Sequence, residues 1–411
     1  YIIVGDIGAA HVWLLKTNSL GDTLWTKIYE GKYGNYVQQT SDGGYIITGF
    51  SDFGNLPNVL LIRTDSSGNI LWVKNIRGES SRGGECVQQT KDEGFIIISG
   101  YSLNFESTDI WLMKTNEIGD TLWTRKIGGD KIDYPYSIDQ TNDGGYIILG
   151  KTDSNNSENW DVYLVKTDSL GRVLWSKTFG YQADDVGRTI QQTTDGGYIL
   201  GGHTGSRYGE MDILMIKTDA IGDTMWTRVF ESQWGSCVIE TSDSSYIIIG
   251  TTWSYGAVGG DVVLIKTNNI GEKQWIKTFG DDRPEEGNFV RETIDGGYII
   301  TGSIGTDIWL IKTDEWGDTI WTKIYGGDKN HNSIDTYSAI FPNYYLLNNY
   351  PNPFNSITTI KYHIPKAEHV SISIYDINGK EIETLINTWK QPGRYLVYWN
   401  ATNVSSGIYL Y

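Results

Sequence analysis

The sequence predicts an all-β fold: a seven-bladed β-propeller with four-stranded blades, followed by a small Ig-like β-sandwich. A phrase of the type KTDSLGRVLW occurs seven times and ends on Trp25, Trp72, Trp123, Trp175, Trp226, Trp275 and Trp321, which lie 46 to 52 residues apart. A second phrase, of the type DGGYIITG, keeps the same period. A repeat of this length is typical of circular or stacked arrays. The 411 residues include 27 Tyr and 16 Trp but only 4 Met, which favours strands over helices.

Each repeat contains four strand-like segments. In the fourth repeat these are SIDQT (137–141), YIILG (146–150), DVYLVKT (161–167) and VLWSK (173–177). Asp-Gly-Gly between the first two segments and Thr-Asp-x-x-Gly between the last two supply the glycines that tight hairpin turns require. The middle segments are apolar at consecutive positions, so we expect both sheet faces to be buried between neighbouring blades. The repeated Trp is then a packing residue.

The ends of the array predict how the ring closes. The first repeat lacks its innermost strand, and Ser333-Ile334-Asp335 resembles Ser137-Ile138-Asp139, so we expect a closing strand near residues 332–340. An eighth blade stays possible, because the chain starts inside a strand-like segment. We therefore predict a propeller over residues 1–340, a linker over 341–355 and a β-sandwich over 344–411.

Repeated polar residues favour structural roles. Asp in the first hairpin turn is expected to cap the backbone, at Asp42, Asp92, Asp143, Asp195, Asp243 and Asp295. A ring of Gln or Glu near the axis either lines a water-filled channel or satisfies the inner-strand backbone, at Gln39, Gln89, Gln140, Gln192, Glu240 and Glu292. Cys86 and Cys237 occupy equivalent positions three blades apart, too far for a disulfide, so we expect buried free thiols.

Charge and motifs exclude several classes of function. A net charge of −17 with dispersed basic residues argues against a nucleic-acid partner. No apolar run reaches the length of a transmembrane helix. The five histidines lie apart and form no metal-ligand spacing, and no nucleophile-elbow, zinc-protease, phosphate-loop or EF-hand motif occurs. We expect no metal and no cofactor, and a monomer, because a closed ring leaves no sheet edge free.

The candidate ligand-binding residues lie where the repeat breaks, in the loops of one propeller face. We expect aromatic rings there to stack on sugars or anchor a protein, with Trp160, Trp234 and Trp253 as the first candidates. The other aromatic candidates are Tyr134, Tyr181, Tyr208 and Tyr255. Tyr136, Arg188 and several carboxylates accompany them, among which Asp185 and Glu286 are weak catalytic candidates. The alternative interpretation is that these aromatics pack their own loops.

The outer hairpin resembles known propeller motifs. Its Gly-x-x-x-Trp spacing resembles the tryptophan-docking motif of quinoprotein-type propellers, and its position resembles the Asp box of sialidase-like propellers. Asp168 lies three residues before Gly171 and Trp175 four after it, whereas an Asp box has spacings of two and three. The resemblance implies architecture, since residues for a quinone or a sialidase arginine cluster are not evident.

The C-terminal region resembles the type A C-terminal sorting domain of the type IX secretion system. The resemblance rests on Tyr350, Pro351, Asn352, Pro353, Phe354, Asn355, Gly379, Gly393, Trp399, Gly407 and Tyr409, with their neighbours in the family's order. It implies the secretion machinery as a partner and export to the surface of a Gram-negative cell or beyond. Family members usually continue past this Tyr-rich strand, so we expect the domain to be incomplete at Tyr411.

Together these features predict a secreted or surface-exposed propeller that acts as a binding or adhesion module for a glycan or an extracellular protein. One alternative is a polysaccharide hydrolase or lyase that uses loop carboxylates. Another is a purely structural surface protein. A catalytic carboxyl should have a shifted pKa inside a deep axial pocket, whereas a binding module should present aromatic side chains without one.

Overall fold

The computed structural model divides the chain into two compact units, Tyr1–Thr336 and Tyr337–Tyr411. It describes residues 1–7, 11–52, 58–77, 81–104, 107–154, 159–180, 183–205, 211–231, 233–253, 259–326, 337–338, 345–346, 349, 356–364, 366–391, 393–402 and 404–411. Over these ranges every regular element is a strand. None of the described segments forms a helix with the length and hydrophobicity needed to cross a bilayer.

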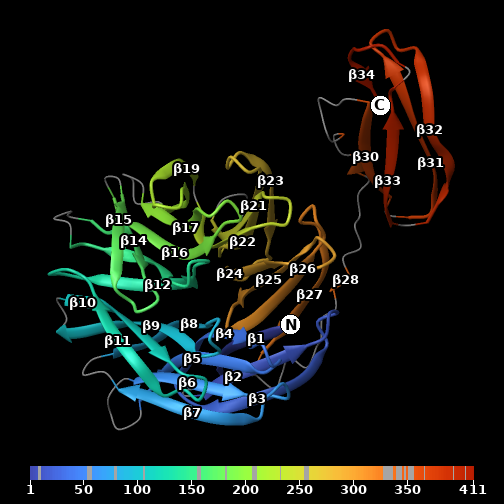
Figure 1. Cartoon of the computed structure of the whole chain (residues 1–411). Helices are drawn as coiled ribbons and strands as arrows, with labels where there is room; N and C mark the ends of the chain where they lie inside the picture. Colours follow the sequence, from blue (N-terminus) through green and yellow to red (C-terminus); the bar gives the residue numbers. More distant parts are fainter. Residues whose placement is uncertain are drawn as a thin grey trace. The chain divides into compact units, whose positions relative to one another are not determined.

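The first unit contains seven antiparallel sheets, as predicted (Figure 1). Sheet by sheet, the strands are β1 (Ile2–Ile7), β2 (His11–Thr17) and β3 (Thr23–Glu30); β4 (Tyr33–Gln39), β5 (Tyr45–Ser51), β6 (Asn58–Thr64) and β7 (Ile70–Arg77); β8 (Ser81–Gln89), β9 (Phe95–Asn104), β10 (Ser107–Thr115) and β11 (Thr121–Ile127); β12 (Asp133–Gln140), β13 (Tyr146–Thr152), β14 (Asp161–Thr167) and β15 (Val173–Phe179); β16 (Asp185–Gln192), β17 (Tyr198–Gly205), β18 (Met211–Thr218) and β19 (Thr224–Phe230); β20 (Gln233–Glu240), β21 (Tyr246–Thr252), β22 (Asp261–Thr267) and β23 (Lys273–Phe279); and β24 (Glu285–Glu292), β25 (Tyr298–Ile304), β26 (Asp307–Thr313) and β27 (Thr319–Tyr325).

Within each sheet the strands follow one another in chain order. The first strand of a full blade lies toward the centre of the ring, as β4, β8, β12, β16 and β24 do in Figure 1. Apolar residues of adjacent sheets form shared cores. In one of them, Ile147 and Leu149 of β13 pack with Leu200 of β17 and Leu214 of β18. The middle strands are therefore buried on both faces, and the four-stranded blade is confirmed.

The repeated Trp packs against the glycine of the next blade's outer hairpin. A Cβ atom added to Gly222 would lie 2.7 Å from Trp175 Cζ3, so only glycine leaves room for the indole ring. The same ring faces Tyr198 of the next blade, with centroids 6.2 Å apart. At the end of the array Trp321 lies against Gly21 in the same way. The last sheet thus contacts the first, and the ring closes with seven sheets.

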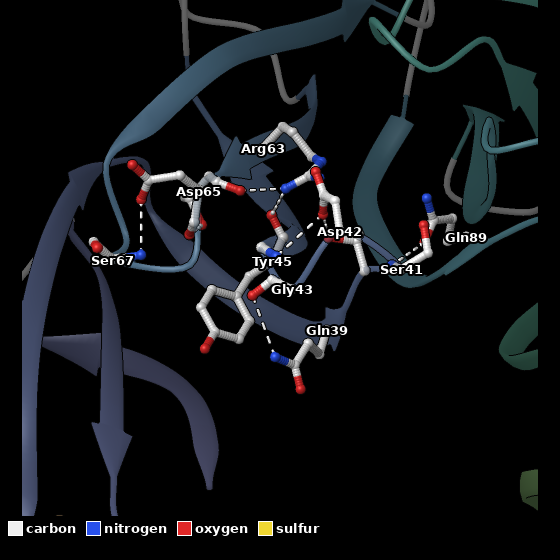
Figure 2. A network of polar contacts seen from close by, with 12 residues as sticks. Gln39, Ser41, Asp42, Gly43, Tyr45, Arg63, Asp65, Ser67 and Gln89 are labelled. Carbon is white, nitrogen blue, oxygen red and sulfur yellow. Dashed lines mark hydrogen bonds and ion pairs between the residues drawn. The ribbon is translucent and has the colours of Figure 1, made fainter.

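A buried cation joins the two hairpins of each full blade. Lys166 in β14 is 4% exposed and pairs with Asp143 in the first hairpin, with Nζ and Oδ2 2.9 Å apart. Asp143 also accepts hydrogen bonds from the Thr141 hydroxyl and the Gly145 N–H. In the sheet of β4 to β7 the cation is an arginine instead of a lysine, and Arg63 pairs with Asp42 (Figure 2). These aspartates cap the hairpin and neutralise the cation, which agrees with their predicted structural role.

The axial Gln and Glu residues bond the backbone of neighbouring blades. Gln89 Oε1 accepts a hydrogen bond from the backbone N–H of Ser41 at 2.8 Å (Figure 2). Gln140 Oε1 accepts one from the backbone N–H of Lys91 at 3.0 Å. One position earlier in the strand, Gln88 Oε1 accepts from the Gln140 N–H at 2.7 Å. Of the two interpretations left open by the sequence, backbone satisfaction accounts for these contacts.

Two further predictions concern the ring. Cys86 and Cys237 are buried and free, as expected.

The first sheet has three described strands, β1 to β3, and the predicted closing strand would be its fourth. Residues 332–336 and 339–340 lie outside the described ranges, and Tyr337–Ser338 form β28, which is not part of the first sheet. The closing strand therefore remains a prediction, as do the domain boundaries.

The second unit contains two three-stranded sheets, ordered β29-β30-β33 and β32-β31-β34. The strands of these sheets are β29 (Tyr345–Leu346), β30 (Ile357–Ile364), β31 (Glu368–Asp376), β32 (Glu381–Lys390), β33 (Gly393–Asn400) and β34 (Tyr409–Leu410). The unit begins with β28 (Tyr337–Ser338), which belongs to neither sheet. Ile360, Ile374 and Trp399 from both sheets form a common core. The unit is a two-sheet β-structure, and its assignment as Ig-like stays a prediction.

Candidate functional site

The inner strands carry a β-bulge at one repeated position. Pairing with the second strand shifts between Gly187 and Thr189 in β16, so Arg188 has no partner in the ladder. The same shift occurs in the other described inner strands. A bulge re-aims a side chain and often lies beside a functional site. The bulged residues are Asn35, Glu85, Tyr136, Arg188, Ser236 and Asn288, which are five residue types at one repeated position.

All six bulged residues line a cavity of about 650 Å³ between the inner strands. Trp234, Trp253 and Glu286 also line it. Deeper along the strands it is lined by Tyr36, Cys86, Ser137, Thr189, Cys237 and Phe289, and then by Gln38, Gln88, Asp139, Gln191, Ile239 and Arg291. A volume of this size is within the range of small-ligand sites.

The middle of the cavity contains an aromatic pair and a buried thiol. Tyr36 of β4 and Phe289 of β24 meet edge to face, with ring centroids 6.3 Å apart. Burial raises the pKa of the Tyr36 phenol well above its usual range, and burial also raises the pKa of the Cys86 thiol to about 12. Both groups are therefore neutral at physiological pH. They are unsuited to act as nucleophiles there.

Arg188 lies within a stack of aromatic side chains. Its guanidinium carbon is 4.3 Å from the centroid of Tyr136 and 5.8 Å from that of Trp234. Trp234 in turn lies against His203 of β17, with ring centroids 4.5 Å apart. Burial, followed by the nearby Arg188 charge, lowers the pKa of His203 to about 4. The imidazole is thus neutral at pH 7, and Arg188 is the cation of this stack.

The acidic groups of the cavity are held differently. The Tyr134 hydroxyl donates a hydrogen bond to Glu85. Asp139 accepts from Gln88 Nε2 at 2.9 Å and from the Gln192 N–H at 3.1 Å. Glu286 is exposed at the strand end. Two of the three carboxylates are therefore bonded by protein donors.

The predicted binding residues divide into three groups. Trp234 and Trp253 line the cavity, and Trp253 is 54% exposed. Trp160 is not among the lining residues; Lys151 Nζ lies 3.9 Å from its ring centroid. Tyr134 reaches the site through Glu85 and packs against Tyr136, with ring centroids 5.2 Å apart. Tyr181, Tyr208 and Tyr255 lie outside the described residues.

The weak catalytic candidates do not form a pair. Asp185 is fully buried and is not a lining residue, whereas Glu286 is a lining residue. Burial raises the pKa of four described carboxyls, Asp6, Asp109, Asp261 and Glu285, and that of Glu285 reaches about 7. Glu285 is fully buried and does not line the cavity. Across the described residues, no cluster of three or more His, Cys, Asp or Glu side chains is arranged to hold a metal ion.

The described residues of the sorting motif have structural roles. Gly379 has a φ of 79° and closes the turn between β31 and β32 by donating to the Asp376 carbonyl. Trp399 is 3% exposed and packs edge to face against Tyr409, with ring centroids 5.1 Å apart. Gly393 begins β33, and Gly407 is exposed before β34. Tyr350, Pro351, Asn352, Pro353, Phe354 and Asn355 lie outside the described residues.

Sequence reasoning placed Tyr136 and Arg188 among loop residues, whereas they are bulged residues of inner strands. It missed Asn35, Glu85, Ser236, Asn288, Arg291 and His203 as parts of the site. A signal was present. The position that follows the repeated Gly or Pro in the inner strand changes in chemistry among the blades, whereas the Val or Ile three residues after the Gly or Pro does not.

Comparisons with known proteins give one family match, at the C-terminal region, and a set of similar solved structures. Residues 348–411 match the model of the Secretion system C-terminal sorting domain. No curated protein matches the chain. Similar solved structures include the Dos1 propeller (10% identity, TM-score 0.48, covering 95% of this chain and 88% of that one) and Sqt1 from Chaetomium thermophilum (10%, 0.46, 73% and 78%). A Trp149Ala mutant of Synechocystis apocarotenoid oxygenase is also similar (11%, 0.45, 76% and 84%).

The family match confirms the resemblance drawn from the sequence. The chain carries a type IX sorting domain after a repeat propeller, and this domain directs export to the cell surface or the medium.

Proposed function

We propose that this protein is an extracellular binding module whose ligand site is the axial cavity of the propeller. The observation that carries the proposal is the convergence of the six bulged side chains, one from each described inner strand, on a cavity of about 650 Å³. The bulged position, the next one and the third after it all line the cavity, and each of them varies among the blades. Variation confined to one surface of a regular scaffold is typical of recognition.

The chemistry of the lining supports binding over catalysis. Trp234, Trp253 and Tyr136 offer flat apolar faces beside amide and carboxylate groups, which suits a sugar ring with its hydroxyls or a protein side chain. A glycosidase needs two carboxyl groups at a set separation, one of them with a raised pKa. The described carboxyls with a raised pKa, Asp6, Asp109, Asp261 and Glu285, are all absent from the cavity lining. Export to the surface or medium would expose the site to extracellular glycans and proteins.

The proposal is tested by binding of the purified chain to a panel of glycans and extracellular matrix proteins. The test variant is Trp234→Ala combined with Trp253→Ala, and Trp160→Ala is the control because it removes an indole on the same face outside the cavity. We expect wild type and control to share a ligand that the double variant binds at least tenfold more weakly. No ligand, or equal binding by all three proteins, would contradict the proposal. Turnover of a bound glycan would instead favour the hydrolase or lyase.

A further inference from the structure

The axial cavity contains an arginine without an ionic partner. Among the described residues Arg188 forms no ion pair, and its Nε is buried without a hydrogen-bond partner. The repeated basic residues behave differently, since Lys114, Lys166, Lys217 and Lys312 each pair with an aspartate. Arg188 is half-buried, and a cation that has lost part of its hydration gains from an anionic partner.

The surroundings of Arg188 fix the orientation of its guanidinium. Tyr136 and Trp234 lie on it at 4.3 and 5.8 Å from their ring centroids, and aromatic faces attract a guanidinium plane. A guanidinium group that is already held by stacking loses little conformational entropy when it binds a ligand. The matching partner is a carboxylate, which accepts two parallel N–H bonds.

The other charged groups of the cavity do not supply that carboxylate. Glu85 accepts a hydrogen bond from Tyr134, and Asp139 accepts from Gln88 and Gln192. Glu286 also lines the cavity, but it is exposed and forms no ion pair with Arg188. Arg291, farther along β24, is a second cation that lines the cavity and lies on Phe289. Two cations and three carboxylates thus line the cavity, and the positive charge that a ligand can use is local to Arg188.

We propose that the axial cavity recognises an acidic sugar, with Arg188 binding the carboxylate of a uronate residue and Trp234 and Trp253 stacking on the sugar rings. The proposal rests on the binding function proposed above and specifies its ligand class. A uronate carries its carboxylate directly on the pyranose ring, so one residue can contact the cation and an indole together. The cavity volume accommodates a short oligosaccharide.

The test is calorimetric titration of the full chain with trigalacturonate, its methyl ester, neutral galactotriose and inorganic phosphate. We expect trigalacturonate to bind at least tenfold more tightly than the other three, with an affinity that falls as salt rises. Arg188→Gln should weaken trigalacturonate binding by about 10- to 100-fold, because a charge-assisted bidentate contact is lost. Arg283→Gln makes the same charge change at an exposed residue outside the lining and should have no effect.

The outcomes separate this inference from the proposed function. Equal binding of trigalacturonate and galactotriose, or unchanged binding by Arg188→Gln, would overturn the acidic-sugar assignment and leave a neutral-ligand module. Phosphate binding as tight as trigalacturonate would show a simple anion site and overturn the sugar assignment. If Arg188→Gln does not fold, the methyl ester still tests the carboxylate on the wild-type protein. Arg188→Lys, which keeps the charge without the fork, should bind with intermediate affinity.

Discussion

Buried lysines of the repeat are held by exposed aspartates. Lys166 is buried, whereas the side chain of its partner Asp143 is 61% exposed. Hydrogen bonds to the Thr141 hydroxyl, the Gly145 N–H and Lys166 outweigh desolvation and lower the pKa of Asp143 to about 2. The carboxylate therefore stabilises the fold above its unfolded pKa of about 3.8, and this contribution is lost as pH falls toward 2.

We predict that Asp143→Asn lowers the free energy of unfolding by about 1–2 kcal/mol at neutral pH. The estimate is modest because the aspartate is largely exposed and solvent screens the pair. Asp130→Asn, at an exposed aspartate, is the control and should change stability by less than about 0.5 kcal/mol. Urea denaturation measures both. An effect of Asp143→Asn no larger than the control would contradict a stabilising role for the pair.

His203 and Glu285 make the free energy of unfolding depend on pH in opposite directions. The folded-state pKa of His203, about 4, lies below its unfolded value of 6.5, so the unfolded chain binds the proton first and stability falls as pH drops from 6.5 to 4. The folded-state pKa of Glu285, about 7, lies above 4.5, so stability falls as pH rises from 4.5 to 7. The two effects partly cancel in the wild type.

Substituting His203 and Glu285 one at a time should separate their two effects on stability. In His203→Gln the loss of stability on acidification from pH 6.5 to 4 should shrink by up to about 3 kcal/mol. In Glu285→Gln the loss on raising pH from 4.5 to 7 should shrink instead. The measurement is the free energy of unfolding against pH for the three proteins. Parallel curves for wild type and His203→Gln would show that His203 titrates normally.

At the scale of the hairpin, two glycines of one blade distinguish backbone strain from packing. Gly144 and Gly171 have φ values of 81° and 73°. A Cβ atom on Gly144 would meet nothing within 4 Å, whereas one on Gly171 would lie 2.6 Å from Trp123 Cζ3. Alanine costs about 1–2 kcal/mol in this left-handed region at either site. Only at Gly171 does it also displace the indole ring of the preceding blade.

We therefore predict that Gly171→Ala is less stable than Gly144→Ala by about 1–3 kcal/mol, the usual cost of overpacking. Chemical denaturation of the two variants gives the difference directly, with Gly144→Ala as the internal control. Equal losses would mean that the tryptophan does not hold the adjacent blades together at this hairpin.

The elements were predictable because their signals repeat. Trp175 recurs at one place in every unit, so its packing role followed from periodicity, and the turn role of Gly171 followed from the hairpin chemistry. The site was predicted only in part. Trp234 and Trp253 line the cavity, whereas Trp160 does not. The sequence places all three residues near strand ends, but it does not specify the direction in which a side chain points there. Arg188 faces the axis because of a bulge, which changes the alternation of faces within the strand.

The whole first unit is a ring held shut by contacts between its first and last sheets. Trp321 is 8% exposed and packs on Gly21, Lys323 Nζ lies 3.3 Å from Asp22, and the Tyr325 hydroxyl donates to the Gly21 carbonyl. These contacts repeat those between internal blades, such as Trp175 with Gly222. Closure removes the free ends that an open array would expose.

Ring closure predicts that Trp321→Ala destabilises the protein by about 3 kcal/mol or more, comparable with Trp175→Ala at an internal interface. Thermal unfolding followed by near-ultraviolet circular dichroism compares the two variants with wild type. In an open array Trp321 would face solvent, so a change below about 0.5 kcal/mol for Trp321→Ala alone would contradict closure.

The most direct measurement of the central claim is a crystal structure of the full chain with trigalacturonate. The account predicts the oligosaccharide inside the axial cavity, with a carboxylate on the Arg188 guanidinium and a sugar ring on Trp234. A ligand bound only on another surface of the chain, with the axial cavity empty, would contradict the claim that this cavity is the functional site.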